Sequence, residues 1–170
     1  TQEVNIDVGR SESIKACEYA NNNNSYIFVT AQKALDVDKP TKDDIYEYGS
    51  LCKIKRFRRK DGYLRVGFIG IYRARMLRQL EVNDIQSVEA EVLEEYYDNE
   101  MVMKELFSKV LQEFDRVKLH ANPQMNVELL KNLKNGITPA ELTDYYAQVY
   151  LFDYKDKQLF IEEPDIIKRL

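Results

Sequence analysis

The sequence has no tryptophan, one histidine and only two cysteines, and these scarcities limit the chemistry available to it. Cys17 and Cys52 stand far apart and match no metal-binding or redox spacing, so we predict two reduced thiols within a core. Reduced cysteines are typical of the cytoplasm, where we place the protein. His120 has no second His or Cys at metal-ligand spacing, so we interpret it as a solvated or helix-end side chain. We therefore predict no metal site.

Long apolar runs are also missing. No stretch approaches the roughly 18 residues that a membrane-spanning helix needs. The first ten residues lack the basic start and apolar middle of a signal peptide, so we expect no membrane partner. The chain has 170 residues, of which 44% are hydrophobic and 32% charged. That composition is ordinary for a globular protein, and the length suffices for one domain or two small ones.

Catalytic motifs are missing as well. The sequence contains no GxxxxGK[ST] phosphate-binding loop, which argues against ATP hydrolysis by this chain. Two serines have a lysine nearby but no elbow or oxyanion signature, and we interpret them as surface or capping residues: Ser13 and Ser50. Four carboxylates fit a solvated strand face better than acid–base work: Glu89, Glu91, Glu94 and Glu95. We predict no catalytic residue and no cofactor-binding residue.

The charge is present but unevenly placed. The net charge is −4, yet residues 53–78 hold ten Lys or Arg against one acidic residue, a local balance of +9. The remaining residues therefore carry −13. Phe57 and Tyr63 are interleaved with this basic segment, so the hairpin 53–65 has the side chains needed to grip phosphate and stack bases. The acidic charge of the whole chain opposes that reading, and a nucleic-acid-binding module remains the alternative function.

The chain is organised around a hairpin at residues 51–76. Asp61-Gly62 is a strong hairpin signal, because glycine tolerates the positive φ that such turns demand. After the turn, Leu64, Val66 and Phe68 alternate with Arg65, Gly67 and Ile69, the period of a strand with one buried face.

The other elements predict strands first and helices afterwards. We expect strands at 3–8, with Val4, Ile6 and Val8 inward, and at 87–92. The run 26–31 is apolar on both faces, which favours a central strand. Helices are predicted at 98–116 with Met101 on the apolar side, at 125–133, from Thr138 and from Asp156. The order indicates an α+β protein, with a β-rich subdomain at 1–95 and a helical subdomain at 96–170.

Several segments match a known family in order and spacing. They are VGR at 8–10 followed by SIKACEYA, IFVTAQK at 27–33, IYEYG at 45–49, KDG at 60–62, RVGFIGIYRARM at 65–76, PAELTDYYA at 139–147, DKQ at 156–158 and RL at 169–170. Together they resemble the amino-terminal domain of bacterial Lon protease over nearly the whole chain. Each fragment is weak alone, whereas their joint order is specific.

The resemblance implies a PUA-like β-barrel followed by a carboxy-terminal helical bundle. It also implies a role in recognising unfolded or degron-bearing proteins for a homo-hexameric serine protease. ATP, Mg and the Ser–Lys catalytic pair would belong to domains outside this fragment. Two departures stand out. The family's first strand, around a PLR…FP pattern, is missing here, and Lys60 replaces the family's proline before the hairpin turn.

The outward face of strands 3–8 and 64–71 is the candidate contact surface: Glu3, Asn5, Arg65, Gly67 and Ile69. Ile69 is an anomaly on a polar wall, which favours apolar contact with a client. The alternative is that Ile69 packs beneath the missing strand or the helical half. A recognition module is thus the main hypothesis, beside the nucleic-acid binder and an enzyme for which no catalytic constellation can be named.

Overall fold

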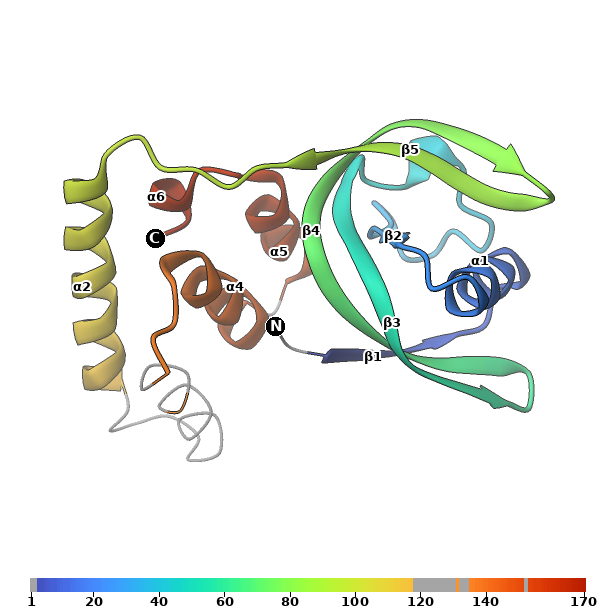
Figure 1. Ribbon diagram of the computed structural model, residues 1–170, viewed down its shortest axis with the longest axis horizontal. Helices are drawn as coiled ribbons and strands as arrows, with labels where there is room; N and C mark the ends of the chain where they lie inside the picture. Colours follow the sequence, from blue (N-terminus) through green and yellow to red (C-terminus); the bar gives the residue numbers. More distant parts are fainter. Residues whose placement is uncertain (1–2, 118–130, 132–134, 152) are drawn as a thin grey trace. The chain divides into compact units, whose positions relative to one another are not determined.

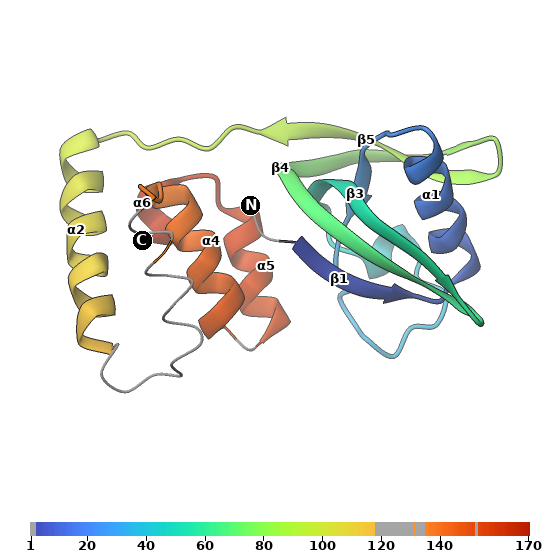
Figure 2. The same ribbon diagram turned by 60° about the horizontal axis from the view of Figure 1, so that its bottom comes forward.

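The computed structural model describes residues 3–117, 131, 135–151 and 153–170 (Figure 1; Figure 2 gives a second view). The chain divides into two compact units, Thr1–Glu94 and Glu95–Leu170, which we describe separately. Except for Lys131, the helix predicted at 125–133 lies outside the described residues, as does His120. No helix within the described ranges has the length and apolar character needed to span a membrane.

The first unit is an antiparallel sheet with one α-helix. Its strands are β1 (Glu3–Val8), β2 (Ile27–Val29), β3 (Tyr48–Lys60), β4 (Tyr63–Val82) and β5 (Ile85–Leu93), and its helix is α1 (Ser11–Asn22). A short 3-10 helix, η1, spans Lys42–Asp44. The strands follow the order β1-β4-β3-β2, and β5 pairs with β4 as well.

The predicted hairpin turn is confirmed, and β4 runs further than predicted. Gly62 has a φ of +83°, the conformation that favours glycine at the turn. Beyond Met76 the strand continues to Val82 and turns into β5 through Asn83 and Asp84. Both turn residues have positive φ, 54° and 59°, as a type I′ hairpin turn requires. The sequence pattern missed this extension because both faces of it are solvated.

The predicted core face of β4 is confirmed. Leu64, Val66 and Phe68 are buried and pack with both cysteine side chains, Cys17 from α1 and Cys52 from β3. Partly buried side chains surround this cluster: Val8, Ile14, Ile27, Val29, Ile54 and Phe57. Both cysteines are free thiols, and burial raises their pKa to about 11. They are therefore protonated and unreactive near neutral pH.

The expected β-barrel is wrong, because the described strands form an open sheet. The sheet ends at β1 on one side and at β2 on the other, and no described pairing joins them. Register shifts between Leu51 and Cys52, between Ile54 and Arg56, and between Met76 and Arg78 mark bulges, which increase local twist. The sheet therefore curves around α1 without closing on itself (Figure 1).

One sequence-based expectation fails at the edges of this sheet, and a second, the inward direction of Val4 and Ile6, is met with incomplete burial. Residues 27–29 form an edge strand that pairs only with β3, and not the central strand that was predicted. Val4 and Ile6 lie opposite Phe68 and Val66, and therefore on the core face, yet they remain 46% and 39% exposed. An edge strand has one neighbour only, so its inward side chains are incompletely covered.

The second unit is helical where it is described. It contains α2 (Glu100–Val117), α4 (Pro139–Tyr150), α5 (Tyr154–Glu162) and α6 (Ile166–Arg169). The predicted start of α4 is confirmed by a capping box. The Thr138 hydroxyl accepts from the Glu141 amide at 3.2 Å, and the Glu141 carboxylate accepts from the Thr138 amide at 2.8 Å. The description of these helices as a bundle stays an expectation.

The core of this unit lies between α2 and α4. Leu142 and Tyr145 are buried, and they are packed by Phe107, Val110, Leu111 and Ile137. Met101, predicted on the apolar side of α2, is 75% exposed, whereas Met103 is buried. Residues 101 and 103 project to nearly opposite sides of a helix, because they are about 200° apart around its axis. Packing of Phe107, Val110 and Leu111 against α4 selects the side that carries Met103.

A buried charge ties three segments of the helical unit together. The Arg169 side chain is 1% exposed and donates to Glu95 at 2.6 Å and to Asp144 at 3.2 Å. The acidic partners are 33% and 55% exposed. A buried charge that loses its partners is strongly destabilising, whereas partly exposed carboxylates can be hydrated.

We predict that replacing Gly49 by Ala destabilises the β unit by about 1–3 kcal/mol, the usual range for overpacking. A Cβ at position 49 would overlap the Val29 carbonyl oxygen and lie 3.0 Å from the Phe28 ring and from the Thr30 Cβ. Gly70→Ala is the matched control, since nothing lies within 4 Å of its Cβ position. Urea unfolding of both variants measures the difference, and equal stabilities would contradict this packing.

We also predict that the double variant Glu95→Gln/Asp144→Asn loses more stability than Arg169→Met. The double variant leaves a buried guanidinium without a charged partner, at a cost of about 3–5 kcal/mol. Arg169→Met removes the buried charge and leaves two carboxylates that water reaches. Lys104→Met, which breaks the exposed pair with Glu100, serves as a control and should cost below about 1 kcal/mol. Chemical unfolding followed by far-ultraviolet circular dichroism ranks the three, and the reverse order would refute this reasoning.

Candidate binding face on the sheet

The register of β1 on β4 brings the five predicted site residues onto one face. Glu3 lies opposite Ile69, and Asn5 lies opposite Gly67. Arg65 lies opposite Asp7 in the same ladder. Directly opposed residues of an antiparallel pair project to the same side of the sheet. The strand alternation therefore located residues that share one continuous face.

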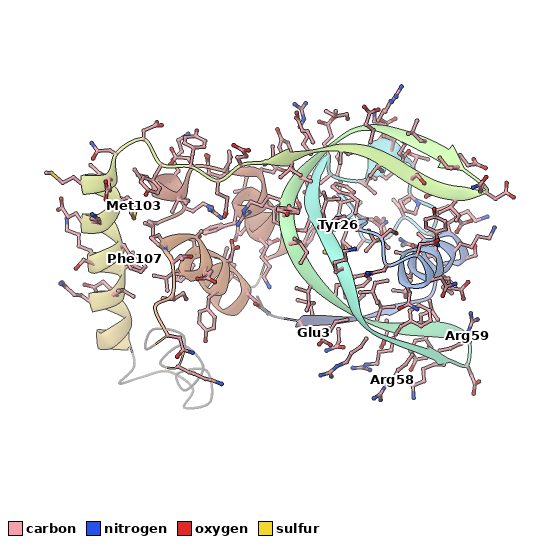
Figure 3. The ribbon with its side chains drawn as sticks, viewed as in Figure 1. Glu3, Tyr26, Arg58, Arg59, Met103 and Phe107 are labelled. Carbon is pink, nitrogen blue, oxygen red and sulfur yellow. The ribbon has the colours of Figure 1, made fainter. Side chains whose placement is uncertain are left out.

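A bulge in β3 adds two arginines that the sequence pattern did not place here. Ile54 pairs with Phe68 on the core side, and after a register shift Arg56 pairs with Gly67 and Arg58 with Arg65. Strict alternation from Ile54 would have turned both arginines toward the core. The extra residue reverses the alternation, so both side chains project outward. Figure 3 shows Glu3 and Arg58 on the lower side of the sheet in that view.

The space above Gly67 is filled by the carboxylate of Glu3. A Cβ at position 67 would overlap Glu3 Oε1 and would lie 3.2 Å from the Arg56 Cβ. Glycine is therefore required here so that the Glu3 carboxylate can lie against the sheet. A bound segment that approached the sheet backbone at Gly67 would first have to displace Glu3.

Two ion pairs cross this face, and one arginine has no described partner. Arg56 Nε lies 3.3 Å from Glu3 Oε1, and an Arg65 nitrogen lies 3.7 Å from Asp7 Oδ1. Within residues 3–117 and the described parts of the helical unit, the Arg58 side chain forms no ion pair or hydrogen bond. A hollow of about 200 Å³ opens between these side chains, lined by Asn5, Arg56, Arg58 and Arg65.

Ile69 is half-buried between polar neighbours. It lies opposite Glu3 on one side and Lys53 on the other. Lys53 itself turns toward β2, since its ammonium contacts the Asn24 carbonyl and lies 4.3 Å from the centre of the Tyr26 ring. Ile69 is thus an apolar position within a charged wall, as the alternation predicted.

The basic hairpin is divided between several surfaces. Lys53 is held at the β2 side, and Arg59 pairs with Glu18 of α1. Arg56, Arg58 and Arg65 project to the same face of the sheet as Lys53, and Arg59 projects to the other face. A nucleic-acid backbone is neutralised by a track of cations on one face, and this division shortens such a track.

Comparison with known sequences shows that the chain is similar to part of several Lon proteases. It is 28% identical over 171 residues to the Lon protease of Bacillus thuringiensis, covering 100% of this chain and 21% of that protein. It is 33% identical over 173 residues to the Lon protease of Clostridium acetobutylicum, covering 98% of this chain and 22% of that protein. The chain therefore spans about a fifth of the length of these relatives.

Solved structures share the fold at low sequence identity. The N-terminal domain of a Mycobacterium avium complex Lon protease superposes with a TM-score of 0.70 at 15% identity, covering 99% of this chain and 85% of that one. A Lon N-terminal domain protein from Xanthomonas campestris gives a TM-score of 0.60 at 15% identity, with the same coverage. An open antiparallel sheet followed by helices is thus the fold of a Lon N-terminal domain.

A family model matches almost every residue of the chain. It describes the ATP-dependent protease La (LON) substrate-binding domain and spans residues 2–170. The match includes the β1–β4 face and the helical unit. We conclude that this chain belongs to the LON substrate-binding domain family.

Proposed function

We propose that this domain captures unfolded or degron-bearing proteins for a Lon-type ATP-dependent protease. The observation that carries the proposal is the match to the substrate-binding domain over residues 2–170. The contact surface we propose is the face that contains Glu3, Asn5, Arg65, Gly67 and Ile69, where an apolar side chain sits among charges. Exposed apolar segments of a client would gain about 25 cal/mol per Å² of buried area before binding costs are subtracted.

In this proposal the domain binds and does not catalyse. ATP, Mg and the Ser–Lys pair would be supplied by other parts of a longer protein, since the chain spans only about a fifth of its relatives. A homo-hexamer of the longer protein would present several such domains to one client, and multivalency would raise the effective affinity. A cytoplasmic location is part of the same proposal.

The nucleic-acid alternative has weaker support. Arg56, Arg58 and Arg65 share a face, but the ammonium of Lys53 is already engaged by the Tyr26 ring, and Arg59 lies on the other face, paired with Glu18. The two acidic side chains of β1, Glu3 and Asp7, also lie among the arginines. A phosphate backbone would meet these negative charges together with the positive ones.

We predict that the protein binds a reduced, unfolded client and not the same client when folded. A folded client hides the apolar segments that the face would contact, and ordering a flexible client keeps the affinity near micromolar or weaker, about −8 kcal/mol. Titration of isotope-labelled protein should shift the amide resonances of Ile69 and its neighbours.

Ile69→Asp should weaken this binding, whereas Leu80→Asp should not. Leu80 is 39% exposed on the β5-paired half of the same strand, so it controls for the introduced charge. Thermal melts of both variants establish that they remain folded. Equal affinities for folded and unfolded client, or equal losses in both variants, would rule out this surface.

We also predict that the purified chain hydrolyses neither ATP nor a denatured protein substrate. The prediction follows from the missing phosphate-binding loop and the missing nucleophile signature. Phosphate release and fluorogenic casein cleavage are the two assays. If ATP hydrolysis or casein cleavage co-purifies with the protein, the domain is not a pure binding module.

A further inference from the structure

We propose that the hollow lined by Asn5, Arg56, Arg58 and Arg65 binds a carboxylate of the captured polypeptide, with Arg58 as its main donor. The inference rests on the proposed function, and it names the chemistry that the client would offer. Two sources of that chemistry exist in a protein: the side chains of Asp or Glu, and the terminal carboxylate. Apolar contact at Ile69 would then be accompanied by one charged contact on the same face.

The register makes the arginine arrangement unfavourable without an anion. Arg58 lies directly opposite Arg65 in the β3–β4 ladder. Like charges directly opposite each other on a sheet repel. Asp7 reaches Arg65 only at 3.7 Å, and the guanidinium of Arg58 has no ion-pair or hydrogen-bond partner in the described part of the chain. A carboxylate between the two guanidiniums would convert this repulsion into two charge-assisted contacts.

Two of the arginines that line the hollow already pair with carboxylates of the protein itself. β1 contributes one carboxylate to Arg56, from Glu3, and another to Arg65, from Asp7. Three guanidiniums and two carboxylates leave a single positive charge, which one additional carboxylate neutralises. A polyanionic backbone would instead bring repeated negative charges beside Glu3 and Asp7. The local charge therefore favours an acidic peptide over a nucleic acid.

The size and donors of the hollow fit a small planar anion. Its volume is about 200 Å³, enough for a carboxylate and its aliphatic stem. Guanidinium groups present paired N–H donors that match the two oxygens of a carboxylate. The Asn5 amide, from the neighbouring strand, adds a neutral donor. Because the guanidiniums are largely exposed, salt should screen the interaction, and the gain for one carboxylate should be only about three- to tenfold.

The test uses three fluorescent peptides that share one apolar core and an acetylated amino terminus. The first carries internal Glu residues and an amidated carboxyl end, and the second replaces each Glu by Gln. The third has the Gln sequence with a free terminal carboxylate. We expect fluorescence anisotropy at low salt to show three- to tenfold tighter binding of a carboxylate-bearing peptide than of the neutral one. Preference for the first assigns side-chain carboxylates, and preference for the third assigns the terminus.

Arg58→Gln should abolish this preference, and Arg59→Gln should retain it. Arg59 is the matched control because it carries the same charge on the same strand but lies on the other face, paired with Glu18 (Figure 3 labels Arg58 and Arg59). Equal losses in the two variants would reduce the effect to general surface charge and overturn the proposal. Tighter competition by inorganic phosphate or a single-stranded oligonucleotide than by acetate would also overturn it.

A titration with acetate separates this inference from the proposed function. Acetate, with chloride as the reference salt, should shift the Arg58 Nε–Hε resonance of labelled protein and leave Arg59 unchanged. If acetate acts in this way but no peptide binds, the carboxylate site stands and client capture fails. If all three peptides bind equally and acetate has no effect, client capture stands and the carboxylate site is wrong.

Discussion

The β unit depends on one physical constraint, the hydrogen-bonded register along β4. This single strand pairs with β1 through residues 64–69, with β3 through residues 63–75 and with β5 through residues 73–82. Its buried residues form the core, and its outward residues form the candidate face. Because side chains alternate with a period of two, a slip of one residue in β4 would exchange the core for the face.

The Glu3 carboxylate stabilises the candidate face by filling the space where a side chain at position 67 would lie. Glu3 lies above Gly67, and its carboxylate meets Arg56 at 3.3 Å. This contact couples the edge strand β1 to β3 across β4. The Glu3 carboxylate covers the part of the sheet at Gly67 that a client would contact. A client that binds there must therefore displace Glu3. That competition is consistent with the weak, reversible capture expected of a recognition domain.

Charge in this protein is organised by face and not by segment. The basic residues of the hairpin lie close together in sequence, but pairing and a bulge send Arg59 toward α1 and Arg56 and Arg58 to the candidate face, where Lys53 bends toward β2. In the helical unit, by contrast, Arg169 is buried and pairs with two acidic side chains. Exposed cations remain available for ligands, whereas the buried one joins segments of the fold.

The sequence by itself determined the local features of this chain. The Asp61-Gly62 turn, the buried alternation of Leu64, Val66 and Phe68, and the capping box at Thr138 each follow from neighbouring residues, and each is confirmed. The ordered motifs also indicated the family, and the family model over residues 2–170 confirms it. Sequence suffices for this conclusion because family membership depends on residue identity along the whole chain.

Tertiary structure decided what depends on distant pairing. Whether the sheet closes, whether residues 27–29 are central or at an edge, and which residue of the first turn of α2 is buried all depend on neighbours far away in sequence. The placement of Arg56 and Arg58 depends on a bulge, which adds one residue to β3 and reverses its alternation. The sequence pattern of one strand cannot predict this bulge, because a residue is extra only by comparison with the partner strand.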